Sequence, residues 1–196
     1  MIYTPEDCFS CSFCPLNFED SMIYQISNFL DQHIVDEITK KYENSRGQPV
    51  FEINNMGRWG DGLGHGSFAP VFVLKLDEYQ DYFHQKYQAV DPVFADYTDL
   101  VCFLHIWTPG SQINFHHDGD ISDGVDRLSS TIYITPTWNW NWGGLFIYDD
   151  PDRGQGWVYP HYNHMVWFRP PVWHSTSMIT LAAEHPRLSI QLFFTK

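Results

Sequence analysis

The run Gln112-Ile113-Asn114-Phe115-His116-His117-Asp118 decides how the rest of the chain is interpreted. Successive side chains of a β-strand point to opposite faces, so Asn114, His116 and Asp118 are expected on one face and His117 on the other. One imidazole and one carboxylate then converge. They form two thirds of a 2-His-1-carboxylate triad, which binds Fe(II) and leaves coordination positions open. The third ligand has to come from elsewhere in the chain.

The composition indicates one soluble globular domain. The chain has 196 residues, 43% of them hydrophobic and 17% aromatic, which is enough to bury a substantial core. No run of eighteen apolar residues occurs, and the stretch from Met1 to Asp7 lacks the basic start and apolar segment of a signal peptide. We therefore expect a cytoplasmic protein that does not enter a membrane.

The charge argues against nucleic acid as a partner. The formal net charge is -13, with only 11 Lys and Arg, so the surface would repel a phosphate backbone. The acidity is expected to serve solubility, and attraction of a cationic substrate is the alternative. The oligomeric state does not follow from the sequence.

Three of the four cysteines, Cys8, Cys11 and Cys14, lie close together near the N-terminus. A C-x2-C-x2-C run can bind zinc or an iron–sulfur cluster, but it supplies only three thiolates, and no second C-x-x-C pair follows. A redox or disulfide role and ordinary terminal thiols are the other interpretations. Cys102 stands in an apolar stretch and is expected in the core.

Two helices are predicted in the first half. Leu30, Ile34, Ile38 and Tyr42 recur every four residues and mark one apolar face. The second helix is expected to open with a capping box formed by Asp77 and Gln80, and to bury a stripe of Tyr79, Phe83, Tyr87 and Val90. Between the two helices, residues 54–66 form a glycine-rich loop, which is either a flap that contacts substrate through Arg58, Trp59 and His65 or a plain surface connection.

Short strands separated by turn signals dominate the second half. They are expected at 100–107, 112–118, 128–135, 144–148, 164–168, 174–180 and 187–194, after earlier strands at 49–53 and 70–76. This pattern predicts a mainly β protein of the α+β class, a jelly roll or double-stranded β-helix with the N-terminal helices packed on one sheet. We expect a single domain over residues 1–196, with 1–99 as helical and loop support and 100–196 as the core.

Four downstream histidines could supply the third ligand: His161, His164, His174 and His185. His174 is the best placed because it follows Pro170-Pro171 and opens an alternating stretch, so its approach is fixed. Further on, Arg187 and Ser189 share one face of a strand. A guanidinium beside a hydroxyl suits a carboxylate, and the alternative is an internal salt bridge to an Asp or Glu.

The ordered set of these elements resembles the Fe(II)/2-oxoglutarate-dependent oxygenases, in the branch similar to prolyl hydroxylases. The likeness covers roughly residues 100 to 194 and departs from the family at two points. The interval of 13 positions from His174 to Arg187 is longer than usual, and Tyr133-Ile134-Thr135 stands where the family has Tyr-Leu-Asn. The matching elements are Pro109-Gly110, His116-His117-Asp118, Arg127, Tyr133-Ile134-Thr135, Trp138, Trp142-Gly143-Gly144, His174 and Arg187-Leu188-Ser189.

The resemblance implies roles for six residues. His116, Asp118 and His174 would bind Fe(II), and Arg187, with Ser189 and Tyr133, would bind the distal carboxylate of the co-substrate 2-oxoglutarate. O2 would take the remaining position. Related halogenases replace the aspartate with a small residue, so Asp118 implies hydroxylation of a C–H bond, with release of succinate and CO2.

The substrate is the point at which the sequence becomes uninformative. An amino acid or a peptidyl, especially prolyl, substrate would suit the aromatic surroundings, although most of the tryptophans concerned are expected in the core. They are Trp107, Trp138, Trp140, Trp142, Trp157 and Trp173. The rival interpretations are a catalytically inactive cupin-like binding or structural protein, and a metal-dependent hydrolase, for which no general base is evident.

Overall fold

The computed structural model of the chain describes residues 23–46, 52–54, 69–118, 124–150, 154–169 and 172–196. The predictions for Cys8, Cys11, Cys14 and residues 55–66 lie outside these ranges. Among the described residues, no helix combines the length and the apolar character needed to cross a membrane.

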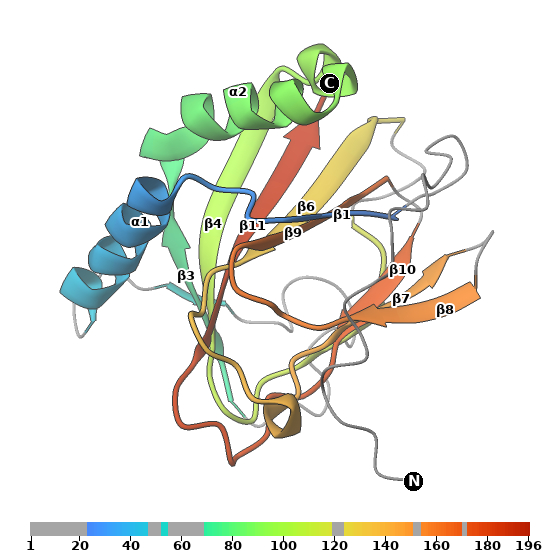
Figure 1. The fold of residues 1–196 in the computed structure, drawn as a ribbon. Helices are drawn as coiled ribbons and strands as arrows, with labels where there is room; N and C mark the ends of the chain where they lie inside the picture. The colour runs from blue at the N-terminus through green and yellow to red at the C-terminus, as the bar shows by residue number, and fades with distance from the viewer. Residues whose placement is uncertain (1–22, 47–51, 55–68, 119–123, 151–153, 170–171) are drawn as a thin grey trace, which may run out of the picture.

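Two antiparallel sheets form the body of the protein (Figure 1). The seven-stranded sheet has the order β1-β9-β6-β11-β4-β3-β2, and the four-stranded sheet has the order β5-β10-β7-β8. The strands of the first are β1 (Ile23–Ser27), β2 (Glu52–Asn54), β3 (Val71–Lys75), β4 (Asp99–Trp107), β6 (Arg127–Tyr133), β9 (His164–Phe168) and β11 (Arg187–Thr195). Those of the second are β5 (Ile113–His116), β7 (Phe146–Asp150), β8 (Gly154–Val158) and β10 (Trp173–Thr176). This arrangement confirms the predicted mainly β jelly roll.

Two helices cover the outer face of the large sheet, α1 (Gln32–Ser45) and α2 (Gln80–Val90) (Figure 1). Strand alternation explains the packing, because every second residue of β4 and β11 enters the same core cluster as the helix faces. The strands contribute Cys102, Leu104, Ile106, Leu188, Ile190, Leu192 and Phe194, and the helices contribute Ile34, Val35, Ile38, Phe83 and Tyr87. The intervening residues of β4 and β11 face the second sheet, where the polar side chains gather.

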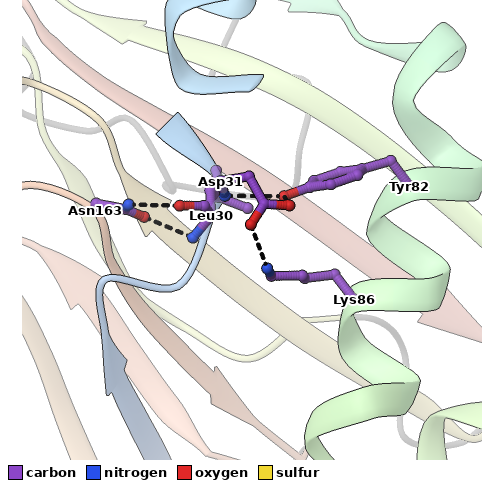
Figure 2. A network of polar contacts seen from close by, with 5 residues as sticks. All are labelled: Leu30, Asp31, Tyr82, Lys86 and Asn163. Carbon is purple, nitrogen blue, oxygen red and sulfur yellow. Dashed lines mark hydrogen bonds and ion pairs between the residues drawn. The ribbon is translucent and has the colours of Figure 1, made fainter. Parts of the chain in front are cut away.

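A polar network fixes the start of α1 (Figure 2). The side-chain amide of Asn163 pairs with both backbone groups of Leu30, each at 2.8 Å, and Asn163 itself has a positive φ of 53°. The carboxylate of Asp31 accepts from the Tyr82 hydroxyl at 3.0 Å and from Lys86 at 2.9 Å. These hydrogen bonds keep the pKa of Asp31 below its ordinary value. The network therefore ties α1 to α2 and to the turn before β9.

Several local predictions were wrong. Asp77 does not cap α2, since residues Asp77–Tyr79 form a separate 3-10 turn, and Val90, the last residue of the helix, is exposed. The expectation that most of the tryptophans lie in the core also fails, because Trp140, Trp157 and Trp173 are about half exposed or more. Sequence gives weak information here because tryptophan is common both in cores and at surfaces.

Candidate metal and co-substrate site

Three side chains meet between the sheets, His116 at the end of β5, Asp118 just after it and His174 in β10. The Nε2 atom of His116 lies 3.5 Å from Oδ1 of Asp118, and Nε2 of His174 lies 3.7 Å from Oδ2. The potential ligand atoms of the three side chains lie within 4.8 Å of one another. Among the described residues, these three side chains form a group that could hold a metal ion. Two imidazoles and one carboxylate at this spacing fit a 2-His-1-carboxylate metal centre.

The backbone reaches this arrangement differently from a regular strand. His174 pairs with His116, but Thr176 pairs with Ile113, so two intervening residues of β5 oppose one of β10 in a β-bulge. The extra residue breaks the alternation, and Ile113 and His116 both line the same pocket. Asp118 lies at a bend two residues beyond the end of β5, and its carboxylate is 3.5 Å from the Nε2 atom of His116.

Both histidines are held in the tautomer that a metal requires. Nδ1 of His116 donates to the carbonyl of Asn114 at 2.8 Å, and Nδ1 of His174 donates to the carbonyl of Val172 at 3.1 Å. With the proton on Nδ1, each Nε2 lone pair faces the carboxylate of Asp118. Backbone carbonyls of this kind orient metal-binding imidazoles.

The charge state of the triad also suits a cation. Burial opposes ionisation of Asp118, but His174 and His116 beside it outweigh this effect and lower its pKa to about 2, so the carboxylate is ionised. Burial lowers the pKa of His174, which therefore stays neutral. Its ring packs on Phe146 and Phe168 at centroid distances of 5.3 and 4.7 Å. An anionic carboxylate and neutral imidazoles are the forms that bind metal.

The other histidines considered from the sequence do not join this group. His117 packs edge-on against Trp173 at 5.0 Å and is not part of the group of candidate ligands. His164 contacts Ser27 and Gln25, His161 packs on Tyr159, and His185 lies against Trp142. Within the described chain the choice of His174 as the residue beside His116 and Asp118 therefore agrees with the geometry.

Arg187 is the most unusual charged residue near the site. It is 1% exposed, yet no described Asp or Glu forms an ion pair with it, so the internal salt bridge considered from the sequence is not found there. One terminal nitrogen donates to the carbonyl of Gly144, and Nε has no hydrogen-bond partner among the described residues. The guanidinium lies over the rings of Trp107 and Tyr133, at 4.7 and 5.3 Å. A buried cation without a carboxylate is costly, which points to an anionic ligand.

Two hydroxyls lie on the same face as Arg187. Ser189 and Tyr133 are directly paired between β11 and β6, and both are fully buried. The indole Nε1 of Trp107 donates to Oγ of Ser189 at 3.0 Å, so the hydroxyl proton of Ser189 is available to another acceptor. Burial raises the pKa of Tyr133 to about 12, which keeps its phenol protonated. The structure thus brings the three residues predicted to bind 2-oxoglutarate into one cluster.

The motif Trp142-Gly143-Gly144 has a steric reason. Both glycines have positive φ, 69° and 70°. A Cβ on Gly143 would lie 2.1 Å from the carbonyl oxygen of Met178, and one on Gly144 would lie 2.5 Å from Cδ1 of Ile179 and 3.2 Å from Arg187. The backbone can approach the guanidinium only because side chains are missing here.

A pocket between the sheets connects the triad with the inner faces of β4, β6 and β11. Besides the triad it is lined by His105, Trp107, Ile113, Thr131, Phe146, Thr176, Gln191 and Phe193. His105, Thr131 and Gln191 were not singled out from the sequence, although alternation along β4 would put His105 and Trp107 on the face opposite Leu104 and Ile106. Burial and the nearby charge of Arg187 lower the pKa of His105 to about 3, so it adds no charge to the pocket.

The fold and the site together define a double-stranded β-helix protein with a candidate mononuclear metal centre. Residues 102–195 match the family model described as the 2OG-Fe(II) oxygenase superfamily. A search of curated protein sequences gave no match.

Solved structures show the same fold at low sequence identity. A Pseudomonas putida prolyl-4-hydroxylase is 18% identical with a TM-score of 0.71, and the match covers 89% of this chain and 92% of that chain. A prolyl hydroxylase from Trichoplax adhaerens, in complex with a hypoxia inducible factor oxygen degradation domain peptide fragment, is 16% identical with a TM-score of 0.70, covering 88% and 83%. A non-haem α-ketoglutarate-dependent epimerase from nogalamycin biosynthesis is 13% identical with a TM-score of 0.61, covering 90% and 79%.

Proposed function

We propose that this protein is an Fe(II)- and 2-oxoglutarate-dependent dioxygenase that hydroxylates a C–H bond of an amino-acid or peptidyl substrate and releases succinate and CO2. The observation that carries the proposal is the presence of two features among the described residues. The triad of His116, Asp118 and His174 offers three metal ligands, and Arg187 offers a buried cation without a described carboxylate partner.

In this proposal His116, Asp118 and His174 hold Fe(II), which supplies O2 activation coupled to oxidative decarboxylation when it is bound. The residues present fit such a group, because both Nε2 atoms and the ionised carboxylate converge. Phe146 and Phe168 fix the ring of His174 and exclude water from one side of the centre.

Arg187, Ser189 and Tyr133 would bind the distal carboxylate of 2-oxoglutarate. The guanidinium supplies charge-assisted hydrogen bonds, and the two hydroxyls each have a proton to donate, for the reasons given above. Three donors on one buried face match the lone pairs of a single carboxylate. The same cluster would impose a length limit on the acid, because its other end has to reach the triad.

The substrate class is the less constrained part of the proposal. Two of the structural neighbours are prolyl hydroxylases, which favours prolyl peptides as the first class to test. The epimerase among the neighbours shows that the fold also serves other reactions. The net charge of -13 favours neutral or cationic substrates and disfavours nucleic acid. We include the helices α1 and α2 in the same catalytic domain, since they share its core.

An anaerobic titration tests the proposal directly. Protein loaded with Fe(II) should develop a weak visible charge-transfer band when 2-oxoglutarate is added, and admission of air should produce succinate. Asp118→Ala serves as the control and should show neither. If the wild-type protein binds Fe(II) but gives no band and no succinate, the oxygenase activity is refuted. Succinate formation stimulated by free amino acids or by proline-containing peptides would then identify the substrate class.

A further inference from the structure

We infer that Gln191, oriented by Thr131, is a further co-substrate-binding residue that donates a hydrogen bond to the keto-acid end of 2-oxoglutarate. This inference rests on the proposed function. It concerns the end of the co-substrate that lies at the metal, whereas Arg187, Ser189 and Tyr133 concern the distal carboxylate. Neither Gln191 nor Thr131 belongs to the sequence pattern that identified the site.

The position of Gln191 follows from the alternation along β11. Leu188, Ile190 and Leu192 face the helices, so Arg187, Ser189 and Gln191 share the inner face. Gln191 lies four positions after Arg187, which corresponds to roughly 13 Å of strand at about 3.4 Å per residue. A five-carbon diacid that is bound at Arg187 and also reaches the triad would lie along this face, where Gln191 is the next inward-facing residue of β11 after Ser189.

The pocket places Gln191 beside the metal ligands. Gln191 and Thr131 line the same pocket as His116, Asp118 and His174. They are also cross-strand partners, paired between β11 and β6. Trp107 lines this pocket too, and the guanidinium of Arg187 lies over its ring at 4.7 Å, so one side chain borders both the pocket and the anion-binding cluster.

A hydrogen bond sets the direction of the amide. Oγ1 of Thr131, which is buried, donates to Oε1 of Gln191 at 2.7 Å. The carbonyl end of the amide is therefore directed at β6, and the Nε2 group points away from it. Within the described residues no acceptor takes a hydrogen bond from Nε2. An amide nitrogen with two protons is thus presented to a pocket that also holds the candidate metal ligands.

The chemistry of the ligand completes the inference. A keto acid that chelates a metal through one carboxylate oxygen and its keto oxygen has a second carboxylate oxygen that needs a donor. Gln191 can donate without adding charge, because its amide is neutral, and His105 next to it on the inner face of the sheet is neutral as well. Arg187 then remains the charge that selects a diacid over a monoacid, while Gln191 holds the end that reacts.

The affinity of Mn(II)-loaded protein for 2-oxoglutarate, measured by calorimetry, tests this assignment. Gln191→Leu should weaken binding about tenfold to a hundredfold, the effect of losing a hydrogen bond to a charged group. Thr131→Val keeps the amide but loses its orientation, so a smaller loss of about threefold to tenfold is expected. Mn(II) affinity should stay within about twofold of wild type in both variants.

An analogue separates the two ends of the co-substrate. 2-Oxovalerate has the keto acid but lacks the distal carboxylate, so Gln191→Leu should weaken its binding by the same factor as for 2-oxoglutarate. Loss of the Arg187 guanidinium should leave 2-oxovalerate binding unchanged. In the anaerobic Fe(II) complex, Gln191→Leu should also shift the visible charge-transfer band, because that band reports the chelated keto acid.

The matched control is Gln155→Leu, the same change at an exposed position of β8, which should alter none of these readouts. If Gln191→Leu binds 2-oxoglutarate within twofold of wild type, or loses affinity for Mn(II) in parallel, the assignment of Gln191 is overturned. If wild-type protein itself does not bind 2-oxoglutarate, the proposed function fails before any variant is compared. The two failures are therefore distinguishable.

Discussion

Replacement of Arg187 by methionine separates a ligand-binding role from a structural one. Methionine retains much of the side-chain volume and removes the charge. If the guanidinium is present to bind a carboxylate, Arg187→Met should abolish tight binding of 2-oxoglutarate and leave the ligand-free protein about as stable as before. If the guanidinium is structural, the variant should instead unfold more easily.

The contacts of Arg187 indicate how much the variant should change the affinity for 2-oxoglutarate and the free energy of unfolding. Truncation of one partner of a buried, hydrogen-bonded charge pair costs about 2–5 kcal/mol, or roughly 30-fold to several thousandfold in affinity. In the ligand-free protein, the variant loses the hydrogen bond to Gly144, worth about 1.5–3 kcal/mol, and the contacts over Trp107 and Tyr133, worth about 0.5–2 kcal/mol. Against this, it no longer buries an unpaired cation, a penalty of several kcal/mol. The free energy of unfolding should therefore change by only about 2 kcal/mol or less.

Urea unfolding and calorimetry measure the two effects separately. Wild-type protein with Mn(II) should gain about 2.7 kcal/mol of stability at a 2-oxoglutarate concentration one hundred times the Kd, and Arg187→Met should gain almost none. Mn(II) affinity should be retained in the variant. A fall in ligand-free stability of more than about 4 kcal/mol, or an equal loss of metal and co-substrate binding, would refute the reasoning.

Three further predictions concern the surroundings of the site. Gly144→Ala should lower the free energy of unfolding by about 2–4 kcal/mol in urea titrations, because the new Cβ would crowd Ile179 and Arg187. Gly154→Ala, with a similar φ of 78° but no atom within 4 Å of the new Cβ, should lose only about 1–2 kcal/mol, and equal losses would mean that these two contacts are unimportant. His117→Ala should keep metal affinity within about threefold, while His174→Ala should lower it at least about a hundredfold; the reverse order would exclude His174 as a ligand. The pKa of Asp118 is lowered from 3.8 to about 2, so its contribution to the stability of the metal-free protein is complete above pH 3.8 and disappears as the pH falls through 2. Asp118→Asn should therefore flatten the dependence of the free energy of unfolding on pH between pH 4 and pH 2, measured by urea unfolding. An unchanged slope would contradict this charge state.

Sequence periodicity was sufficient for the large elements. Alternation in β4 and β11 fixed which residues face the helices, because a two-residue period has one apolar face and the hydrophobic residues have to be buried. The four-residue spacing of Ile34 and Ile38 predicted α1 in the same way. The choice of His174 rested on its place at the start of a strand, and the structure brings it to His116 and Asp118.

Local backbone geometry was the first thing that the sequence could not give. The bulge in β5 and the bend at Asp118 depart from the regular strand from which the site was first inferred, yet the same two side chains lie together. A bulge depends on how one strand pairs with another, and pairing is a property of the assembled sheet. The exposure of Trp140 and Trp157 was also decided by packing, since nothing in their own segments distinguishes a buried indole from an exposed one.

The chain by itself therefore determined the order of the chemical groups, the faces of the strands and the identity of the candidate ligands, because these depend on residue type and local period. Only the tertiary structure decided what surrounds each group. It showed that Arg187 is buried without an ion pair to any described carboxylate, and that Thr131 donates a hydrogen bond to Gln191 in the pocket that holds the candidate ligands. Both facts involve residues at least 43 positions apart, Arg187 with Gly144 and Thr131 with Gln191, and contacts at that separation exist only after the sheets have formed.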